Sequence, residues 1–317
     1  MQHHITAISG DGIGKEVIPA TIRVLESLAL PITVTWAEAG FGTFEASGTA
    51  LPNATLAQCQ ASDAILFGAT QSPMTKVEGY SSPILALRTQ LGLYANLRPA
   101  KTDTIDMLIV RENTEGLYSR RERLEDDGKT AIAEQVITEF ATRRIVDVAC
   151  QQAMKRRQHL TIVHKANVLK ETGGLFRRVA FDVARDYPDL TVTEQLVDAC
   201  AMKMAMDATQ YDVIVTSNLF GDILSDLAAG LTGGPGLAPS ANIGEKYALF
   251  EPVHGSAPDI AGQGIADPRA AFLCLVMLLR HLGYTHPADR LATAIASIEH
   301  LGTVDATTQA MINHYQT

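Results

Sequence analysis

The sequence predicts an α/β protein with a largely parallel sheet. Short segments rich in β-branched and apolar residues alternate with segments of helical period along most of the chain. The 317 residues suffice for two domain-sized units or one large domain with a sizeable core. The cluster LTGGPGL at 231–237 breaks the chain sharply, so a domain crossover is expected there.

The individual elements follow from local composition. Runs of apolar and β-branched residues predict strands at 5–9, 32–37, 64–68, 160–164, 190–197 and 212–216. Apolar residues at helical spacing predict helices at 14–28, 83–91, 136–156, 174–185, 268–282, 287–300 and 306–315. The stretch 239–258 is expected to be rich in loops.

Composition excludes several classes of function. The formal net charge of -9 and the pI near 5.5 disfavour binding to nucleic acid or to an anionic membrane, which relies on clustered Lys and Arg. The four cysteines are far apart and lack zinc or disulfide spacing, so free buried thiols in a reducing compartment are expected. Without a signal-like or bilayer-spanning apolar run, a cytoplasmic protein is predicted.

A glycine-rich segment, SGDGIGK at 9–15, follows the first predicted strand. It lacks both the G-x-G-x-x-G spacing of dinucleotide-binding folds and the spacing of a P-loop. Ligand contact and a simple strand-to-helix turn therefore both remain open for this segment, with the turn favoured.

Asp222 and Asp226 lie four residues apart, directly after an apolar strand. A helix would place both carboxylates on one face, where their charges repel each other. The pair either complements the helix dipole or binds a hard cation through oxygen. Spacing alone does not decide between these two roles.

Several cationic residues stand in or after strand-like runs. Arg88, Arg98 and Arg111 together suit a substrate with several carboxylates, although each arginine alone is better explained by an ordinary surface ion pair. Lys165 ends a strand and would become a proton acceptor if a metal and arginines lowered its pKa. Taken by itself, it is more simply an exposed lysine.

Taken together, these segments resemble the isocitrate, isopropylmalate and homoisocitrate dehydrogenase family of β-decarboxylating dehydrogenases. The motifs occur in collinear order over nearly the whole chain: GDGIG at 10–14, LYANLRPA at 93–100, VRENTEGLY at 110–118, HKANVL at 164–169, GDILSDLAAGL at 221–231 and EPVHGSAPDIAGQGIADP at 251–268. The resemblance implies an isopropylmalate-dehydrogenase-like fold of two α/β domains without a standard Rossmann motif. It also implies a discontinuous cofactor-side domain, 1–98 plus 236–317, and a dimerisation and metal-site domain, 99–235.

The resemblance assigns roles to the charged residues. It implies that Mg²⁺ or Mn²⁺ is held by three aspartates, that Lys165 removes the hydroxyl proton during hydride transfer to nicotinamide, and that Tyr118 protonates the enolate left by CO₂ loss. Each site is expected to be shared across a homodimer, with Lys165 and Asp198 from the subunit that neighbours the one supplying Arg88 and Asp222. The expected metal ligands are Asp198, Asp222 and Asp226, and the expected substrate-binding residues are Ser82, Arg88, Arg98, Arg111 and Asn167.

The cofactor implied by the resemblance is NAD. Asp259 would accept hydrogen bonds from the adenosine ribose and repel a 2′-phosphate, whereas NADP-using relatives carry Lys and Tyr at the positions of Asp259 and Ile260. The expected cofactor-binding residues are Asn242, His254, Gly255, Ser256, Ala257, Asp259, Ile260 and Asp267. Because relatives generally have Asn at the position of Asp267, affinity for NAD is expected to be weaker here.

The substrate is predicted from the segment before Arg88. The stretch KVEGYSSPI at 76–84 looks most like that of homoisocitrate dehydrogenases. Ser82 also suits isocitrate, whereas Ile84 favours a longer or less polar substituent, and the Ile84-Leu85 pair matches isopropylmalate enzymes. The order of expectation is homoisocitrate, isocitrate and 3-isopropylmalate, with tartrate or an alkyl-malate as a further alternative. The rival from another class is a catalytically silent regulatory subunit.

Overall fold

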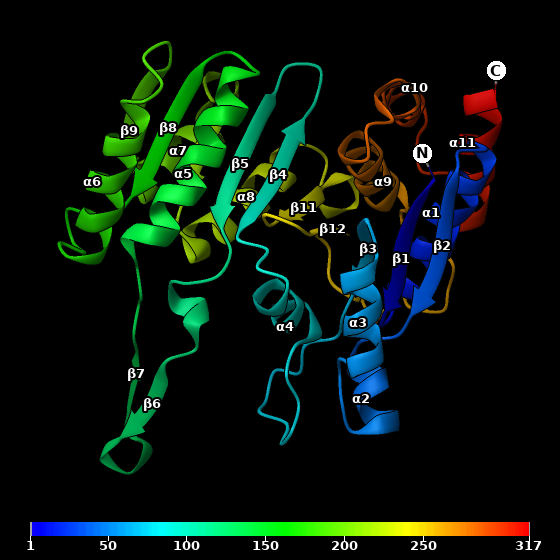
Figure 1. Cartoon of the computed structure of the whole chain (residues 1–317), viewed down its shortest axis with the longest axis horizontal. Helices are drawn as coiled ribbons and strands as arrows, with labels where there is room; N and C mark the ends of the chain where they lie inside the picture. The colour runs from blue at the N-terminus through cyan, green and yellow to red at the C-terminus, as the bar shows by residue number, and fades with distance from the viewer. Residues whose placement is uncertain (1, 317) are drawn as a thin grey trace. The chain divides into compact units, whose positions relative to one another are not determined.

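The structure is a computed structural model that describes residues 2–316, and it divides into two compact units (Figure 1). The terminal unit combines residues up to Leu93 with those from Gly234 onward, and the central unit is Tyr94–Gly233. The chain therefore leaves the first unit, completes the second and returns, at a point within the glycine-rich cluster 231–237.

In the part of the terminal unit that the structure describes, five strands lie in the order β2-β1-β3-β12-β11. All neighbouring strands are parallel except the pair β11 and β12. β3 is buried along its whole length, as a strand covered on both faces must be. The strand bounds are β1 His3–Gly10, β2 Ile32–Ala37, β3 Ala64–Ala69, β11 Pro239–Ile243 and β12 Ala248–Pro252.

Helices pack on these strands through apolar side chains. α3 and α4 contribute Cys59 and Leu87 to a core that also contains Phe67 of β3 and Leu249 of β12, while α1 and α9 contact β1 and β12. The helix bounds are α1 Gly14–Ser27, α2 Phe41–Ser47, α3 Asn53–Ala61, α4 Pro83–Gln90, α9 Arg269–His281, α10 Thr285–Ala296 and α11 Val304–Gln316, with η4 at Pro235–Leu237.

The central unit contains five strands in the order β4-β5-β10-β8-β9, with only β4 and β5 antiparallel. Figure 1 shows α5 and α6 in front of this sheet and α7 and α8 behind it. The strand bounds are β4 Ala95–Lys101, β5 Asp106–Glu112, β8 His159–His164, β9 Thr191–Leu196 and β10 Val213–Thr216. The helix bounds are α5 Glu139–Met154, α6 Thr172–Ala184, α7 Val197–Met206 and α8 Asn218–Leu231, with η1 at Leu117–Ser119 and η3 at Ala208–Gln210.

An antiparallel hairpin leaves the central unit between η1 and α5 (Figure 1). It consists of β6, Glu122–Glu125, and β7, Thr130–Ala133, joined by η2, Asp126–Gly128. Nearly all of its side chains are exposed, so the two strands do not pack into the hydrophobic core of the central unit.

The α/β class with a mostly parallel arrangement of strands is confirmed, and most expected elements are present within a few residues. The expectation of loops at 239–258 was wrong for 239–252, where β11 and β12 form an antiparallel pair. The helix expected from 136 begins only at Glu139, since Thr138 caps it by accepting a hydrogen bond from the Ala141 amide at 3.1 Å. The helix expected at 287–300 runs from Thr285 to Ala296.

No helix in residues 2–316 is both long and apolar enough to cross a bilayer.

Candidate active site

The parallel strands of the central unit end close to the residues with candidate chemistry. The carboxyl ends of neighbouring parallel strands meet at one edge of a sheet, which is where α/β proteins bind ligands. Arg111 is the second-last residue of β5, Lys165 directly follows β8, and Asp198 lies two residues after β9. After β10 the chain turns into α8, which carries both Asp222 and Asp226.

The first turns of α8 form one polar face. Asn218, Asp222 and Asp226 are spaced by four, so the helix presents them along the same side. The Asp222 side chain is 31% exposed and that of Asp226 is 68% exposed. The helical arrangement expected for the two aspartates is therefore present, and it includes an asparagine not expected from the sequence.

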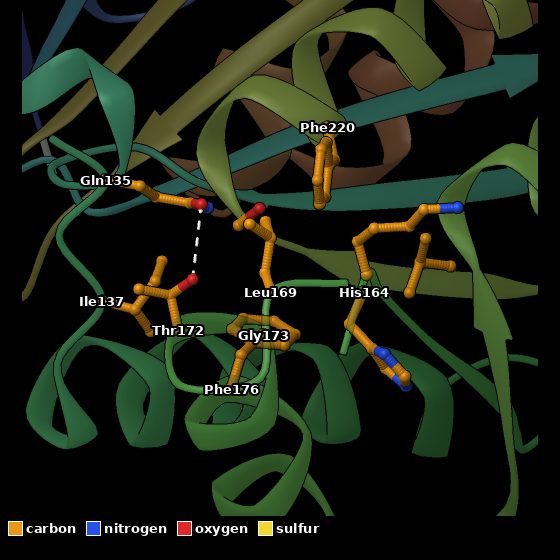
Figure 2. Close-up of a pocket in the computed structure, with 11 residues that line it drawn as sticks. Gln135, Ile137, His164, Leu169, Thr172, Gly173, Phe176 and Phe220 are labelled. Carbon is orange, nitrogen blue, oxygen red and sulfur yellow. Dashed lines mark hydrogen bonds between the residues drawn. The ribbon is translucent and has the colours of Figure 1, made fainter. Parts of the chain in front are cut away.

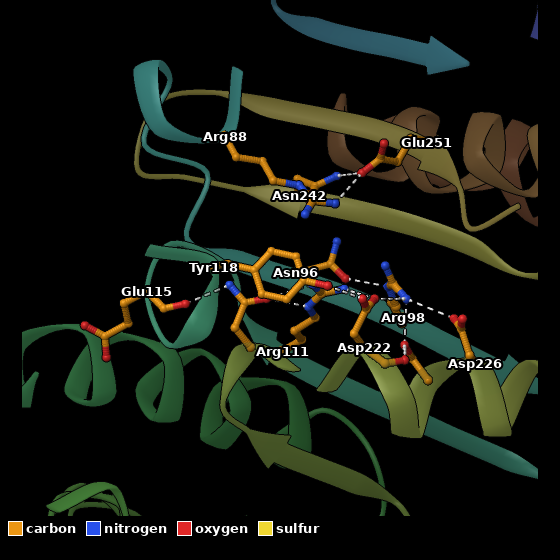
Figure 3. A network of polar contacts seen from close by, with 12 residues as sticks. Arg88, Asn96, Arg98, Arg111, Glu115, Tyr118, Asp222, Asp226, Asn242 and Glu251 are labelled. Atoms are coloured by element: carbon orange, nitrogen blue, oxygen red, sulfur yellow. Dashed lines mark hydrogen bonds and ion pairs between the residues drawn. The ribbon is translucent and has the colours of Figure 1, made fainter. Parts of the chain in front are cut away.

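Arg111 is fixed on this face of α8 (Figure 3). Its Nε and Nη2 both donate to Asn218 Oδ1, at 2.9 and 2.7 Å, and its Nη1 donates to Asp222. The residue is 1% exposed, and a Cβ added to Gly221 would lie 2.6 Å from Arg111 Cγ. A glycine at position 221 thus makes room for the buried arginine against the helix.

Arg98 lies in the middle of β4, which pairs antiparallel with β5 and places Arg98 opposite Ile109. Its Nη1 is 3.2 Å from Asp222 Oδ1 and 3.4 Å from Asp226 Oδ1. It also contacts two neutral acceptors: Nε donates to Asn96 Oδ1 at 2.7 Å and Nη1 to Ser225 Oγ at 2.6 Å. Nη1 of Arg98 thus contacts both aspartates.

Tyr118 lies on η1 and meets the same carboxylate. Its hydroxyl donates to Asp222 Oδ2 at 2.5 Å, and the Arg111 guanidinium carbon lies 5.0 Å from the ring centroid (Figure 3). Burial and the negative charge of Asp222 raise the pKa of the Tyr118 hydroxyl, and Arg111 opposes this effect. The phenol therefore holds its proton at neutral pH and is available as a donor.

The two aspartates offer oxygen donors that suit a hard divalent cation. Burial and the neighbouring charge of Asp222 raise the pKa of Asp226, and Arg98 lowers it. A cation would relieve this repulsion, so the donor set fits Mg²⁺ or Mn²⁺. Within residues 2–316, however, no three His, Cys, Asp or Glu side chains come together as a metal-binding group.

Lys165 and Asp198 form a separate pair in the central unit. Lys165 Nζ lies 2.5 Å from Asp198 Oδ1, and this contact lowers the pKa of Asp198. Lys165 lines a pocket, shown in Figure 2, where Thr172 donates to Gln135 Oε1 at 3.4 Å. Asn167 lies two residues beyond the lysine, in a second pocket that His164 also lines.

Arg88 belongs to α4 of the terminal unit and is also buried. Its Nη2 donates to Glu251 Oε1 at 2.9 Å, and Asn242 Nδ2 donates to the same oxygen at 2.8 Å. Arg88 Nε is buried without a hydrogen-bond partner among the described residues. Ser82 immediately precedes the helix, and its hydroxyl forms no capping hydrogen bond. Ile84 packs against the core of the unit.

The loop after β12 carries most of the expected cofactor residues. Burial lowers the pKa of His254, so its imidazole is neutral near pH 7, and its Nδ1 lies 3.0 Å from the Gly255 carbonyl oxygen. Asp259 is exposed, whereas Asp267 is paired with Arg269 at 2.8 Å. Gly255 and Ala257 flank Ser256, and Ile260 donates its amide to the Ala257 carbonyl.

The glycine-rich segment 10–14 forms a strand-to-helix turn. Gly10 and Gly12 both have positive φ, and a Cβ on Gly12 would lie 2.0 Å from the Ser256 carbonyl oxygen. Ile13 donates its amide to that same oxygen at 2.9 Å. The turn therefore seats the loop after β12 directly against the start of α1.

Comparison with known proteins gives a family. The family model described as isocitrate/isopropylmalate dehydrogenase matches residues 4–313. The chain belongs to this family. Among its curated relatives, the isocitrate/homoisocitrate dehydrogenase of Thermus thermophilus is 50% identical and the match covers 98% of this chain and 96% of the relative. The 3-isopropylmalate/3-methylmalate dehydrogenase of Methanocaldococcus jannaschii is 48% identical, covering 95% and 92%.

A solved structure agrees with this assignment. The crystal structure of isocitrate dehydrogenase from Methylococcus capsulatus has a TM-score of 0.94, with 40% sequence identity and complete coverage of both chains. The protein is therefore an oxidative decarboxylating dehydrogenase of the isocitrate, isopropylmalate and homoisocitrate type. The names of its relatives differ in substrate.

Sequence reasoning missed several residues that hold the arginines of this family member in place. They are Asn96, Asn218, Ser225 and Glu251. Asn218 shares the four-residue spacing of the two aspartates, so that signal was available. Arg88 and Glu251 are separated by 163 positions, so no local sequence pattern indicates that they pair.

Proposed function

We propose that the protein catalyses the NAD-dependent oxidative decarboxylation of homoisocitrate to 2-oxoadipate and CO₂. The observation that carries this proposal is the contact of Asp222 with both Arg111 and the Tyr118 hydroxyl. Asp222, a candidate cation ligand, therefore contacts both an anion-binding guanidinium and a proton donor. The cytoplasm is the proposed location.

The three arginines are proposed to bind the substrate carboxylates. Arg98 and Arg111 are each held by neutral side chains and aspartates, which orients their guanidiniums before substrate arrives. The unpartnered, buried Nε of Arg88 leaves a donor that a carboxylate can satisfy. Asn167 and Ser82 are proposed to make further polar contacts with the substrate. The Ser82 hydroxyl does not cap α4 and is therefore available for this role.

Asp222 and Asp226 are proposed to hold a divalent cation together with Asp198, and the loop 254–260 with Asn242 and Asp267 to bind NAD. When bound, the cation polarises the hydroxyl and later the carbonyl oxygen of the substrate, and NAD accepts the electrons of the oxidation. Exposed Asp259 is proposed to accept hydrogen bonds from the ribose hydroxyls and to disfavour NADP.

The chain's own residues would move the protons. Lys165 is proposed to accept the proton of the substrate hydroxyl as the neutral amine, and its contact with Asp198 positions the side chain for this transfer. The Tyr118 hydroxyl is proposed to deliver a proton to the carbon that loses CO₂. Because Asp222 and burial raise its pKa, this proton is retained until the enolate forms.

A homodimer with shared sites is part of the proposal. In one chain, Lys165 contacts Asp198 while Tyr118 contacts Asp222, and no described cluster joins the three aspartates. We infer that Lys165 and Asp198 of each subunit complete the site that contains Tyr118 and Asp222 of the other subunit. The central unit would then provide the dimer contacts.

The choice of homoisocitrate is supported by the segment KVEGYSSPI and by the Thermus thermophilus relative, whose name includes homoisocitrate. The same relative's name also supports isocitrate as the second candidate. The Methanocaldococcus jannaschii relative supports 3-isopropylmalate as the third. A catalytically silent subunit is opposed by the presence of Tyr118, Lys165 and the three aspartates.

The test is to measure NADH formation with Mg²⁺ and NAD and to compare kcat/KM for homoisocitrate, isocitrate and 3-isopropylmalate. The expected result is the highest kcat/KM with homoisocitrate and turnover of at least one other acid. Preference for another acid, including D-malate or tartrate, would refute the choice of substrate. Failure of all these acids with both NAD and NADP would refute the catalytic proposal and favour a silent subunit.

A further inference from the structure

The segment 71–82, which precedes α4, contains no helix or strand of its own. Most of its residues are exposed, and Met74 is fully so. Its conformation therefore depends on a few contacts with the rest of the terminal unit. Ser82 ends the segment at the start of α4, where its carbonyl oxygen accepts the Ala86 amide at 3.1 Å.

Asp11 provides the first of these contacts. Its carboxylate is buried and accepts the Gln71 amide at 3.0 Å, the Phe41 amide at 2.7 Å and the Gly42 amide at 2.9 Å. Gly40 has a φ of 139°, and a Cβ there would lie 2.6 Å from this carboxylate. One side chain thus holds both the start of the segment and the first turn of α2.

An aromatic clamp provides the second contact, at the other end of the segment. The Tyr80 ring meets Phe41 and Phe44 of α2 edge-on, with centroids 5.3 and 5.4 Å apart. A Cβ on Gly79 would lie 3.7 Å from the Phe44 ring. The Tyr80 hydroxyl donates to the Gln71 carbonyl at 2.9 Å, which ties the two ends of the segment together.

We propose that Phe41, Phe44 and Tyr80 determine substrate preference by fixing the position of Ser82. The inference rests on the proposed function, in which Ser82 contacts the part of the substrate that differs between acids. Ser82 follows Tyr80 by two residues, so their Cα atoms are at most about 7 Å apart. A change in the position of Tyr80 is therefore expected to displace Ser82. Isocitrate and homoisocitrate differ by one methylene, and displacements of about 1 Å decide such differences.

Two variants test the clamp. Phe44→Leu keeps an apolar side chain but removes the ring edge, and Tyr80→Phe removes only the hydroxyl that reaches Gln71. The ratio of kcat/KM for homoisocitrate to that for isocitrate is expected to change by about 5-fold or more in Phe44→Leu and by less in Tyr80→Phe. Tyr284→Phe is the matched control, since its hydroxyl contacts His3 in the same unit, and its ratio should stay at the wild-type value.

The outcomes separate the two proposals. A changed ratio in Phe44→Leu with an unchanged control supports the clamp. An unchanged ratio, or an equal loss of kcat/KM on both acids together with a lower melting temperature, overturns it and assigns the rings a purely structural role. If the wild type turns over neither acid, the proposed function fails, and the clamp fails with it.

Discussion

Asn218 holds Arg111 through a single oxygen atom. Its Oδ1 accepts from both Nε and Nη2 of Arg111, while its own Nδ2 donates to the Glu115 carbonyl at 3.1 Å. The Asn218 side chain therefore fixes the orientation of the guanidinium, and its own orientation is fixed by the hydrogen bond to the segment that leads to Tyr118. Arg111 Nη1 is left directed at Asp222.

Replacement of Asn218 should impair substrate binding and turnover. In Asn218→Ala the buried guanidinium loses two hydrogen bonds, so kcat/KM is expected to fall by about 10- to 100-fold, the usual cost of a hydrogen bond to a charged group. Steady-state kinetics with the preferred acid measures this loss. Asn313→Ala, at an exposed asparagine of α11, is the control and should be unchanged. Equal activity of both variants would show that Asn218 does not orient Arg111 for binding.

Removal of the Tyr118 hydroxyl should abolish the proton delivery proposed for it. Tyr118→Phe is expected to lower kcat by about 10²- to 10⁴-fold, the range typical of a lost general acid. Tyr187→Phe is a matched control, because the Tyr187 hydroxyl also donates to an aspartate, Asp147, at 2.6 Å. Rates of NADH formation and of CO₂ release should be measured separately. Wild-type rates of both in Tyr118→Phe would exclude Tyr118 as the acid.

Shared sites predict complementation between two inactive variants. Tyr118→Phe and Lys165→Ala homodimers should each be nearly inactive, because every site lacks one group. After mixing and reassembly, random pairing should restore about a quarter of wild-type activity, since half of the dimers then contain one intact site. Mass spectrometry of the reassembled dimers verifies the mixing. No recovery in verified heterodimers would show that both groups act within one subunit.

The buried thiols should make the protein less stable at alkaline pH. Burial raises the pKa of Cys59 and Cys150 to about 12 and that of Cys200 to about 11. An unfolded thiol ionises near pH 8.5, so above that pH the unfolded state binds fewer protons than the folded state. The stability is therefore complete below about pH 8 and is lost progressively as pH rises toward the folded pKa.

Substitution of one thiol isolates this effect. In Cys150→Ala the decline of the unfolding free energy should be shallower by about 1.4 kcal/mol per pH unit above about pH 9. The cavity left by the sulfur costs the same at every pH, so it shifts the curve without changing the slope. Urea denaturation under reducing conditions, from neutral to alkaline pH, measures both terms. Parallel curves for the wild type and the variant would contradict the prediction.

The sequence predicted the part of the site that depends on local spacing. Asp222 and Asp226 are four residues apart after a strand, so their shared helix face followed from helical geometry alone. Lys165 was predicted at a strand end because the segment 160–164, which is rich in apolar and β-branched residues, ends directly before it. Both predictions needed only the local residue pattern and no knowledge of contacts between distant segments.

What could not be predicted depends on contacts between distant segments. Arg98 lies in the middle of β4, and its side chain contacts Asp222 of α8, which is 124 positions later in the chain. The role of Asp11 requires that three backbone amides from two later segments converge on it. A single sequence does not contain that convergence, although it did contain the Gly-Asp-Gly turn that allows it.

The interrupted chain of the terminal unit has a consequence for its synthesis. β3 is buried along its whole length and pairs on one side with β12, through Ile65 and Leu249. A ribosome that has made β3 must add the whole central unit before it supplies that neighbour. Once β1 to β3 have formed, the nascent chain therefore carries an apolar sheet edge without its neighbour throughout this interval, and such an edge is a surface that chaperones bind.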